Sequence, residues 1–231
     1  MGTSNRERIM KILCVAQVED RANLDAQILK QTFKPWRTVF YIDEDPEKSP
    51  DGRRIRIADN HKKLQSIVRA YKPDLVWQVE QDGVYSEDCL ERLVERYQEL
   101  NDKDFGYISG IQVGRHGLYH LGAWRNFTDT SFESLDYKLK GIQEVEATGF
   151  YCLLAPTDVW LSGQATWNGE PYGPDVTFSL SLRKLGYRIF VDIGLEIGHK
   201  IKSGIIMPSH ASTCNVKFTL ENNVWKFKQL D

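Results

Sequence analysis

The chain has 231 residues, of which 41% are hydrophobic and 27% are charged, as in an ordinary soluble globular protein. Its formal net charge of −2 argues against a general nucleic-acid binder, which usually carries a basic excess. No apolar run approaches the roughly 20 residues that a membrane-spanning helix needs, so we predict no membrane span.

The cysteines and the N-terminus bear on the compartment. The four cysteines, Cys14, Cys89, Cys152 and Cys214, are far apart and show no CxxC spacing. This pattern predicts neither a zinc site nor a disulfide framework, and it favours a reduced, cytoplasmic protein. Residues 1–9 lack the apolar core of a signal peptide, and we expect them to be disordered or vector-derived.

The first half of the chain alternates between strand-like and helix-like segments. Apolar or β-branched runs predict strands over residues 10–18, 38–42, 74–79 and 105–113. Apolar residues at helical spacing predict helices over 22–33 and 61–71, and a third helix that follows an N-cap at Ser86 and ends near Leu100. This alternation predicts an α/β fold with a mostly parallel sheet flanked by helices.

The second half is less regular. Residues 114–144 show no long period, and a segment of this length is usually functional or mobile, so we interpret it as a candidate lid. We expect a strand over 146–154, a helix over 175–185 and a strand over 187–191, followed by a polar, less patterned tail from Lys200. Since no linker or repeat interrupts the chain, residues 10–231 are expected to form one domain.

The most informative segment is an apolar run that ends in Glu80-Gln81-Asp82. Ligands of open α/β sheets bind at such strand ends. Two carboxylates this close repel each other unless a cation joins them, and a divalent metal that holds a phosphate-bearing substrate is the chemistry that this favours. The alternative is a solvated acidic turn at the end of a strand.

Further motifs follow in a distinctive order: Ala147-Thr148-Gly149-Phe150, then Pro174-Asp175, then residues 182–189 (LRKLGYRI), then Gly198-His199-Lys200. With Glu80-Gln81-Asp82, this order resembles the GT-A glycosyltransferases, in particular the large inverting family of the synthase type, over nearly all of residues 10–200. The resemblance implies a Rossmann-like GT-A fold with a mixed, mostly parallel sheet. It also implies transfer of a sugar from a nucleoside diphosphate sugar, expected to be a UDP-sugar, to an acceptor hydroxyl. Residues 10–113 would then form the half that binds the nucleotide sugar, and residues 114–231 the half that binds the acceptor.

The resemblance also implies site residues. Asp82 and His199 match metal ligands, with Glu80 as the first acid of the motif, and Mn²⁺ or Mg²⁺ is the implied cofactor. Asp175 matches the general base. On their residue types alone, Asp175 also suits a helix N-cap, and His199 an ordinary histidine at a strand edge.

Two departures from the family pattern keep other functions open. Glu80 replaces an aspartate, and Pro174 stands where the family has an acid. A retaining transferase and a catalytically silent nucleotide- or carbohydrate-binding module therefore remain as alternatives. A sugar nucleotidylyltransferase is disfavoured, because no glycine follows the first strand at Gln17-Val18-Glu19-Asp20.

Other polar and aromatic residues are candidates for substrate contacts. Strand ends and the start of the second helix favour nucleotide-sugar contacts by Gln17, Glu19, Asp43, Asn60, Lys63 and Gln81. Trp124 and Trp167 are candidate acceptor platforms, although tryptophans more often belong to a core. The acceptor itself is left open among a saccharide, a protein, a lipid and a modified nucleobase.

Overall fold

The computed structural model describes residues 10–18, 22, 24–31, 37–44, 52–114, 119–168, 172–210, 214–222 and 224–230, without the side chains of residues 29, 37–44, 53 and 210. The expectations for residues 1–9 and for Glu19 lie outside this part of the chain. Within it, no helix is long and apolar enough to cross a membrane.

A seven-stranded mixed sheet forms the centre of the molecule. Its order is β2 (Arg37–Glu44), β1 (Lys11–Val18), β3 (Leu75–Glu80), β10 (Cys152–Pro156), β5 (Phe105–Ile111), β11 (Arg188–Glu196) and β8 (Ile142–Val145). Strands β2, β1, β3, β5 and β11 share one direction, whereas β10 and β8 run antiparallel to their neighbours. The predicted α/β class with a mixed, mostly parallel sheet is therefore confirmed. Because β8, β10 and β11 come from the second half of the chain, the two predicted halves share this sheet.

Helices cover both faces of the central sheet. One core cluster joins α1 (Ala26–Lys30) and α3 (Cys89–Leu100) to one face, and a second joins α2 (Arg53–Tyr71), α4 (Thr157–Ser162) and α5 (Pro174–Lys184) to the other. Strand β1 shows why both layers form, since Ile12 and Cys14 point into the first cluster while Leu13 and Val15 point into the second.

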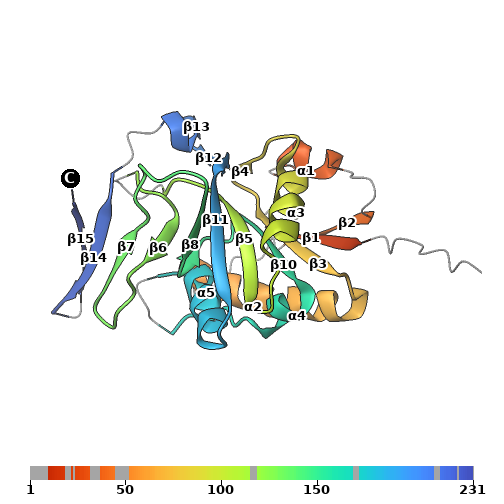
Figure 1. The fold of residues 1–231 in the computed structure, drawn as a ribbon, viewed down its shortest axis with the longest axis horizontal. Coiled ribbons are helices and arrows are strands. Elements are labelled where there is room, and N and C mark those ends of the chain that lie inside the picture. The colour runs from red at the N-terminus through yellow and green to blue at the C-terminus, as the bar shows by residue number, and fades with distance from the viewer. Residues whose placement is uncertain are drawn as a thin grey trace, which may run out of the picture.

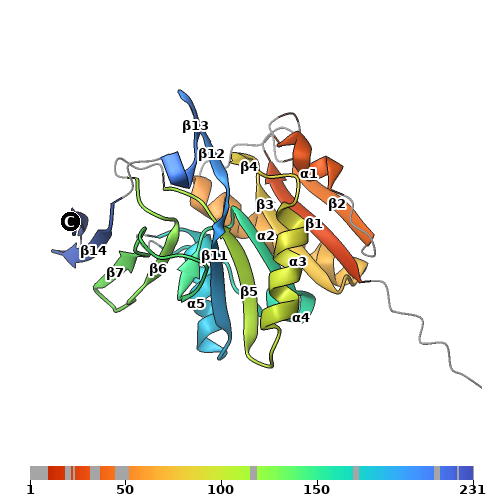
Figure 2. The same cartoon turned by 45° about the horizontal axis from the view of Figure 1, so that its top comes forward.

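Two smaller sheets complete the fold. One contains β13 (Gly204–Ile206), β12 (Gly198–Ile201) and β4 (Gly83–Val84). The other contains β15 (Val224–Gln229), β14 (Val216–Glu221), β7 (Ser131–Ser134), β6 (Ala123–Arg125) and β9 (Ala147–Thr148). Figures 1 and 2 place β14 at the end of the molecule opposite to β1 and β2.

Several predicted boundaries are wrong. Helix α2 begins at Arg53 rather than near residue 61, α1 covers only Ala26–Lys30, and the N-cap of α3 is Asp88 rather than Ser86. The segment 114–144 contains β6, β7 and part of β8, and the tail contains β13, β14, β15 and the short 3₁₀ helix Pro208–His210. The expectation of an irregular lid and an unpatterned tail is thus corrected, because β6 pairs with β7 and β14 with β15, and β7 joins the two hairpins by pairing with β14.

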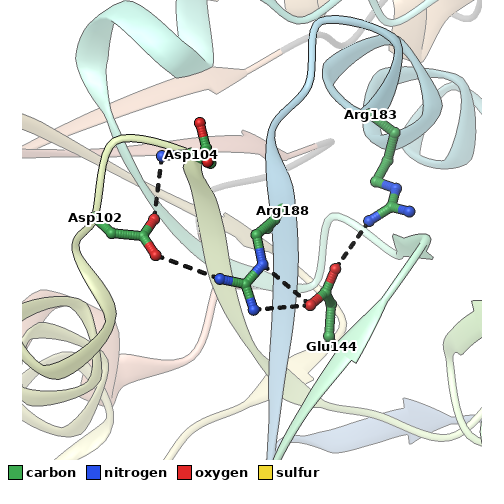
Figure 3. Close-up of polar contacts among 5 residues, drawn as sticks. All are labelled: Asp102, Asp104, Glu144, Arg183 and Arg188. Atoms are coloured by element: carbon green, nitrogen blue, oxygen red, sulfur yellow. Dashed lines mark hydrogen bonds and ion pairs between the residues drawn. The ribbon is translucent and has the colours of Figure 1, made fainter.

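An exposed ion-pair network ties one edge of the central sheet to α5. Figure 3 shows Arg188 of β11 between Glu144 of β8 and Asp102, with Arg183 of α5 on the other side of Glu144. The guanidinium of Arg188, 2.9 Å from Glu144 Oε2, lowers the pKa of that carboxyl. Exposed pairs of this kind contribute little to stability, so the packed clusters hold the fold together.

Candidate active site

Three of the predicted site residues stand in one row at the ends of parallel strands. In register, Gln17 of β1 lies between Asp43 of β2 and Glu80 of β3. Because these strands share one direction, their carboxyl ends meet at the same sheet edge, which is where open α/β sheets bind ligands. The backbone thus places this row as expected, while the side chain of Asp43 lies outside the described atoms.

A short strand pairing brings Asp82 and His199 together from distant parts of the chain. Strand β4 pairs antiparallel with β12, and Gly83 lies opposite His199. The backbone N–H of Lys200 also donates to the carbonyl of Asp82 at 2.8 Å. As a result, His199 Nε2 lies 3.5 Å from Asp82 Oδ2, and both side chains are largely buried, with 9% and 17% exposed.

Tyr85 fixes the turn that presents Glu80 and Asp82. Its hydroxyl donates to the carbonyl of Tyr151 at 2.6 Å and accepts from the backbone N–H of Glu80 at 3.0 Å. Its ring lies so close to Gly83 that a Cβ at that position would overlap the ring. Burial raises the pKa of the Tyr85 hydroxyl well above its usual value, so it remains a neutral donor.

The contacts of His199 suit a metal ligand. Its Nδ1 lies 2.7 Å from the carbonyl of Val113 and donates to it, which leaves Nε2, 3.5 Å from Asp82 Oδ2, as the ring nitrogen that could bind a metal. Metal-bound histidines are commonly oriented in this way by a carbonyl on the other ring nitrogen.

The donor set fits a metal that substrate helps to bind. Among the described residues, no group of three or more His, Cys, Asp or Glu side chains forms a complete protein cage. One carboxylate and one imidazole nitrogen suit Mn²⁺ or Mg²⁺ when diphosphate oxygens and water fill the remaining positions. Glu80 lines the same cavities as Asp82, where it can hold a metal-bound water or a ribose hydroxyl.

Asp175 lies in the first turn of α5, where the helix dipole favours a carboxylate. A Cβ added at Gly173 would lie 2.5 Å from Asp175 Oδ1, so this glycine leaves room for the carboxylate. Behind the turn, Ser179 Oγ donates to the Asp175 carbonyl at 2.9 Å and lies 2.8 Å from the hydroxyl of Tyr107. The Tyr107 hydroxyl also lies 2.8 Å from Thr148 Oγ1. This buried network fixes the start of the helix.

A small polar cavity of about 60 Å³ lies on the β1 side of Asp82. It is lined by Gln17, Val18, Arg56, Ile57, Asn60, Gln78, Val79, Glu80, Gln81, Asp82 and Phe150. This volume accommodates a polar group rather than a whole nucleotide, so a nucleotide would enter it with one end only.

A larger cavity of about 520 Å³ lies on the other side of Asp82, within the size range of small-molecule sites. Asp82, Glu80, His199 and Asp175 all line it. Eight of its other lining residues are aromatic: Trp124, Phe132, Phe150, Tyr151, Tyr172, Phe218, Trp225 and Phe227. The proposed metal ligands and the proposed base therefore share one cavity.

The remaining predicted residues are placed unevenly. Gln17, Asn60 and Gln81 line the small cavity, and Trp124 lines the large one. Lys63 is exposed and lines neither cavity. Trp167 also lines neither, but the guanidinium carbon of Arg54, a residue of the large cavity, lies 5.8 Å from the centroid of its ring.

Sequence reasoning missed several lining residues. Arg54 lines the large cavity and Arg56 the small one, both from the first turns of α2. The signal was three arginines within four residues, but the predicted helix began after them. The aromatic residues of β14 and β15 were missed because the tail was interpreted as unpatterned.

Comparisons with known proteins bear on the fold. No protein-family model and no curated protein matches the chain. The crystal structure of A197 from STIV aligns with a TM-score of 0.59 and 13% identity, over 96% of this chain and all of that one. A glycosyltransferase involved in glycosylation of the major capsid of PBCV-1 has a TM-score of 0.48, 10% identity and coverage of 79% and 81%. GalNAc-T7, crystallised with UDP, GalNAc and Mn²⁺, has a TM-score of 0.48 and 12% identity, over 84% of this chain and 44% of that one.

Proposed function

We propose that this chain is a metal-dependent glycosyltransferase that moves a sugar from a nucleoside diphosphate sugar, with a uridine donor favoured, to an acceptor hydroxyl. The observation that carries the proposal is that Glu80 and Asp82 line both cavities. A transferase must bring two substrates to one point, and Asp82 stands where the two cavities meet.

The donor is proposed to bind on the β1 side. Gln17 and Asn60 line the small cavity and offer amide groups to the base or ribose. Arg54 lines the large cavity and Arg56 the small one, and two guanidinium groups suit the oxygens of a diphosphate that reaches from one cavity to the other. Asp82 and His199 would hold a divalent ion, Mn²⁺ or Mg²⁺, which when bound offsets negative charge on the departing diphosphate.

Asp175 is proposed to act as the general base from the large cavity. An acceptor hydroxyl is a weak nucleophile, and a carboxylate within hydrogen-bond reach removes its proton during attack. The acceptor oxygen forms a bond to the anomeric carbon as the bond from that carbon to the diphosphate oxygen breaks. The proton passes to Asp175, and the bonding electrons leave with the nucleoside diphosphate. Attack from the side opposite to the leaving group inverts the anomeric configuration.

A donor panel tests this function. Nucleoside diphosphate release is measured from UDP-, GDP- and other nucleotide sugars with Mn²⁺, with Mg²⁺ and with a chelator. We expect slow, metal-dependent release from at least one donor, and its loss in Asp82→Ala at an unchanged melting temperature. Full activity in that variant would disprove the assignment. Stabilisation of the fold by nucleotide and Mn²⁺ without any release would instead indicate a silent binding module.

A further inference from the structure

The five-stranded sheet has two chemically different faces. Successive side chains of a strand point to opposite faces of a sheet. On the face toward the large cavity, Phe218 of β14 lies opposite Phe227 of β15 and opposite Phe132 of β7. On the opposite face, Lys217 pairs with Glu133 of β7 and its ammonium lies 3.2 Å from that carboxylate. One face is therefore solvated and charged, and the other is aromatic.

The aromatic face forms a continuous wall of rings. We call Trp124, Phe132, Tyr172, Phe218, Trp225 and Phe227, which all line the large cavity, the aromatic wall. Phe132 and Phe218 stack with ring centroids 4.5 Å apart and an interplanar angle of 11°. Trp225 lies 5.4 Å from Phe132, and Phe227 lies 6.4 Å from Phe218. These mutual contacts hold the rings in place, which lowers the ordering cost of binding a ligand.

The wall runs from the reaction centre to solvent. Phe132 is buried at its inner part, whereas Phe227 is 56% exposed although it lines the same cavity as Asp82 and Asp175. Phe227 thus extends the wall outward, where part of its ring is accessible to a ligand that enters the large cavity.

We propose that the aromatic wall is the acceptor subsite and that its ligand is a neutral saccharide. This inference rests on the proposed transferase function, since it gives the large cavity the second substrate of that reaction. It assigns acceptor binding chiefly to the C-terminal strands β14 and β15, together with Trp124 and Tyr172.

The aromatic rings of the wall and the polar side chains beside it favour a neutral saccharide as the ligand. The faces of aromatic rings are negative, and the axial C–H groups of a pyranose ring present a weakly positive, apolar face that stacks on them. Gln112, His120 and the hydroxyl-bearing Tyr172 line the same cavity and suit the hydroxyl groups at the rim of a sugar ring.

Two other acceptor classes fit the wall less well. A lipid chain favours a groove closed to water, whereas Phe227 at the outer end is mostly in solvent. An anionic ligand would need cations on the wall, but the lysines of β14 and β15 alternate with the wall residues and lie on the opposite face.

A binding experiment and an activity experiment test the proposal together. Binding of neutral di- and trisaccharides built from glucose, galactose, mannose or N-acetylglucosamine is measured by ligand-observed NMR. A serine- and threonine-containing peptide and a medium-chain alcohol serve as comparison probes. The variants are Phe227→Ala, Trp225→Ala and Trp225→Phe, with Val224→Ala as the matched control. Val224 is 58% exposed on the same strand but belongs to the opposite face. Metal-dependent donor hydrolysis and the melting temperature are measured on every variant.

We expect at least one saccharide to bind, and its dissociation constant to rise about tenfold in Phe227→Ala and Trp225→Ala, as suits the loss of one stacked ring and its buried area. Val224→Ala should bind the saccharide and hydrolyse the donor as wild type does, and Trp225→Phe should retain most of the affinity for the saccharide.

The outcomes separate this inference from the proposed function. If no saccharide binds, if the wall variants bind normally, or if the peptide or the alcohol binds through the wall instead, the subsite assignment is overturned even when hydrolysis is intact. If neither wild type nor any variant hydrolyses a donor but saccharide binding depends on Phe227, the transferase proposal fails and the saccharide site stands.

Discussion

His61 gives the sharpest quantitative prediction, because it is a histidine held neutral inside an aromatic box on α2. It is 1% exposed, and neither ring nitrogen has a hydrogen-bond partner among the described residues. The rings of Phe150, Trp160 and Phe178 lie 5.4, 4.6 and 5.1 Å from its own, and Phe150 is parallel to it within 5°. Burial lowers the pKa of His61 from its usual 6.5 to about 3.

This shift makes stability depend on pH with a defined sign. Between pH 6.5 and pH 3 the unfolded chain binds a proton at His61 and the folded chain does not, so stability falls as the pH falls. From the two pKa values, the His61 contribution to the free energy of unfolding is roughly 2–3 kcal/mol smaller at pH 4.5 than at pH 7. Once the pH is below both pKa values, the free energy of unfolding is lower by about 5 kcal/mol than it is at neutral pH, because of His61 alone.

The assay is urea denaturation of wild type and His61→Phe at pH 7 and at pH 4.5. The phenylalanine keeps a ring in the box but cannot titrate. We expect the free energy of unfolding of wild type to fall by roughly 2–3 kcal/mol more than that of the variant between these pH values. Arg69→Ala, an exposed substitution on the same helix, should behave as wild type does. Equal pH dependence in wild type and His61→Phe would refute the argument from burial.

Three further predictions concern the candidate site. Gly173→Ala should lower kcat by about tenfold to a hundredfold at an unchanged melting temperature, since a Cβ 2.5 Å from Asp175 Oδ1 displaces the carboxylate; a turnover assay with normal kcat would contradict this. Asp175→Asn should lower kcat for transfer by about 10²–10⁴-fold while the dissociation constant of the donor stays the same, as titration calorimetry would check. Arg56→Ala should raise the donor KM by roughly tenfold or more through loss of a charge-assisted contact, whereas Arg69→Ala should leave it unchanged.

The central strands, and the polar residues Gln17 and Glu80 at the ends of β1 and β3, could be predicted because local sequence patterns mark them. Strands β1, β3 and β5 are buried on both faces and therefore consist of nearly continuous apolar runs. The acidic pair at the end of β3 stands out against such a run, and so the segment around Glu80 and Asp82 could be found from the sequence.

Other features depend on contacts that no local pattern reveals. Helix α2 begins after Gly52 without any side-chain cap, so no capping residue marked its first turns, and the arginines there were not assigned to a helix. The pairing of β4 with β12 joins residues more than a hundred positions apart through two short strands, and it brings His199 close to Asp82.

The aromatic wall, by contrast, left a signal that its polar composition obscured. Residues 216–221 read VKFTLE and residues 224–229 read VWKFKQ, which is the alternation of half-buried strands. Lysines on the outer face lowered the overall hydrophobicity of these strands. Periodicity rather than composition would have identified both the hairpin and its aromatic face.

The most direct test of the account is the metal dependence of nucleoside diphosphate binding, measured by titration calorimetry on wild type, Asp82→Asn and Asp175→Asn. We predict that wild type and Asp175→Asn bind the nucleotide with Mn²⁺ present and at least about tenfold more weakly with a chelator, and that Asp82→Asn binds weakly in both conditions. Binding that does not depend on metal, or that survives unchanged in Asp82→Asn, would contradict the proposal that Asp82 joins the donor site to the acceptor site.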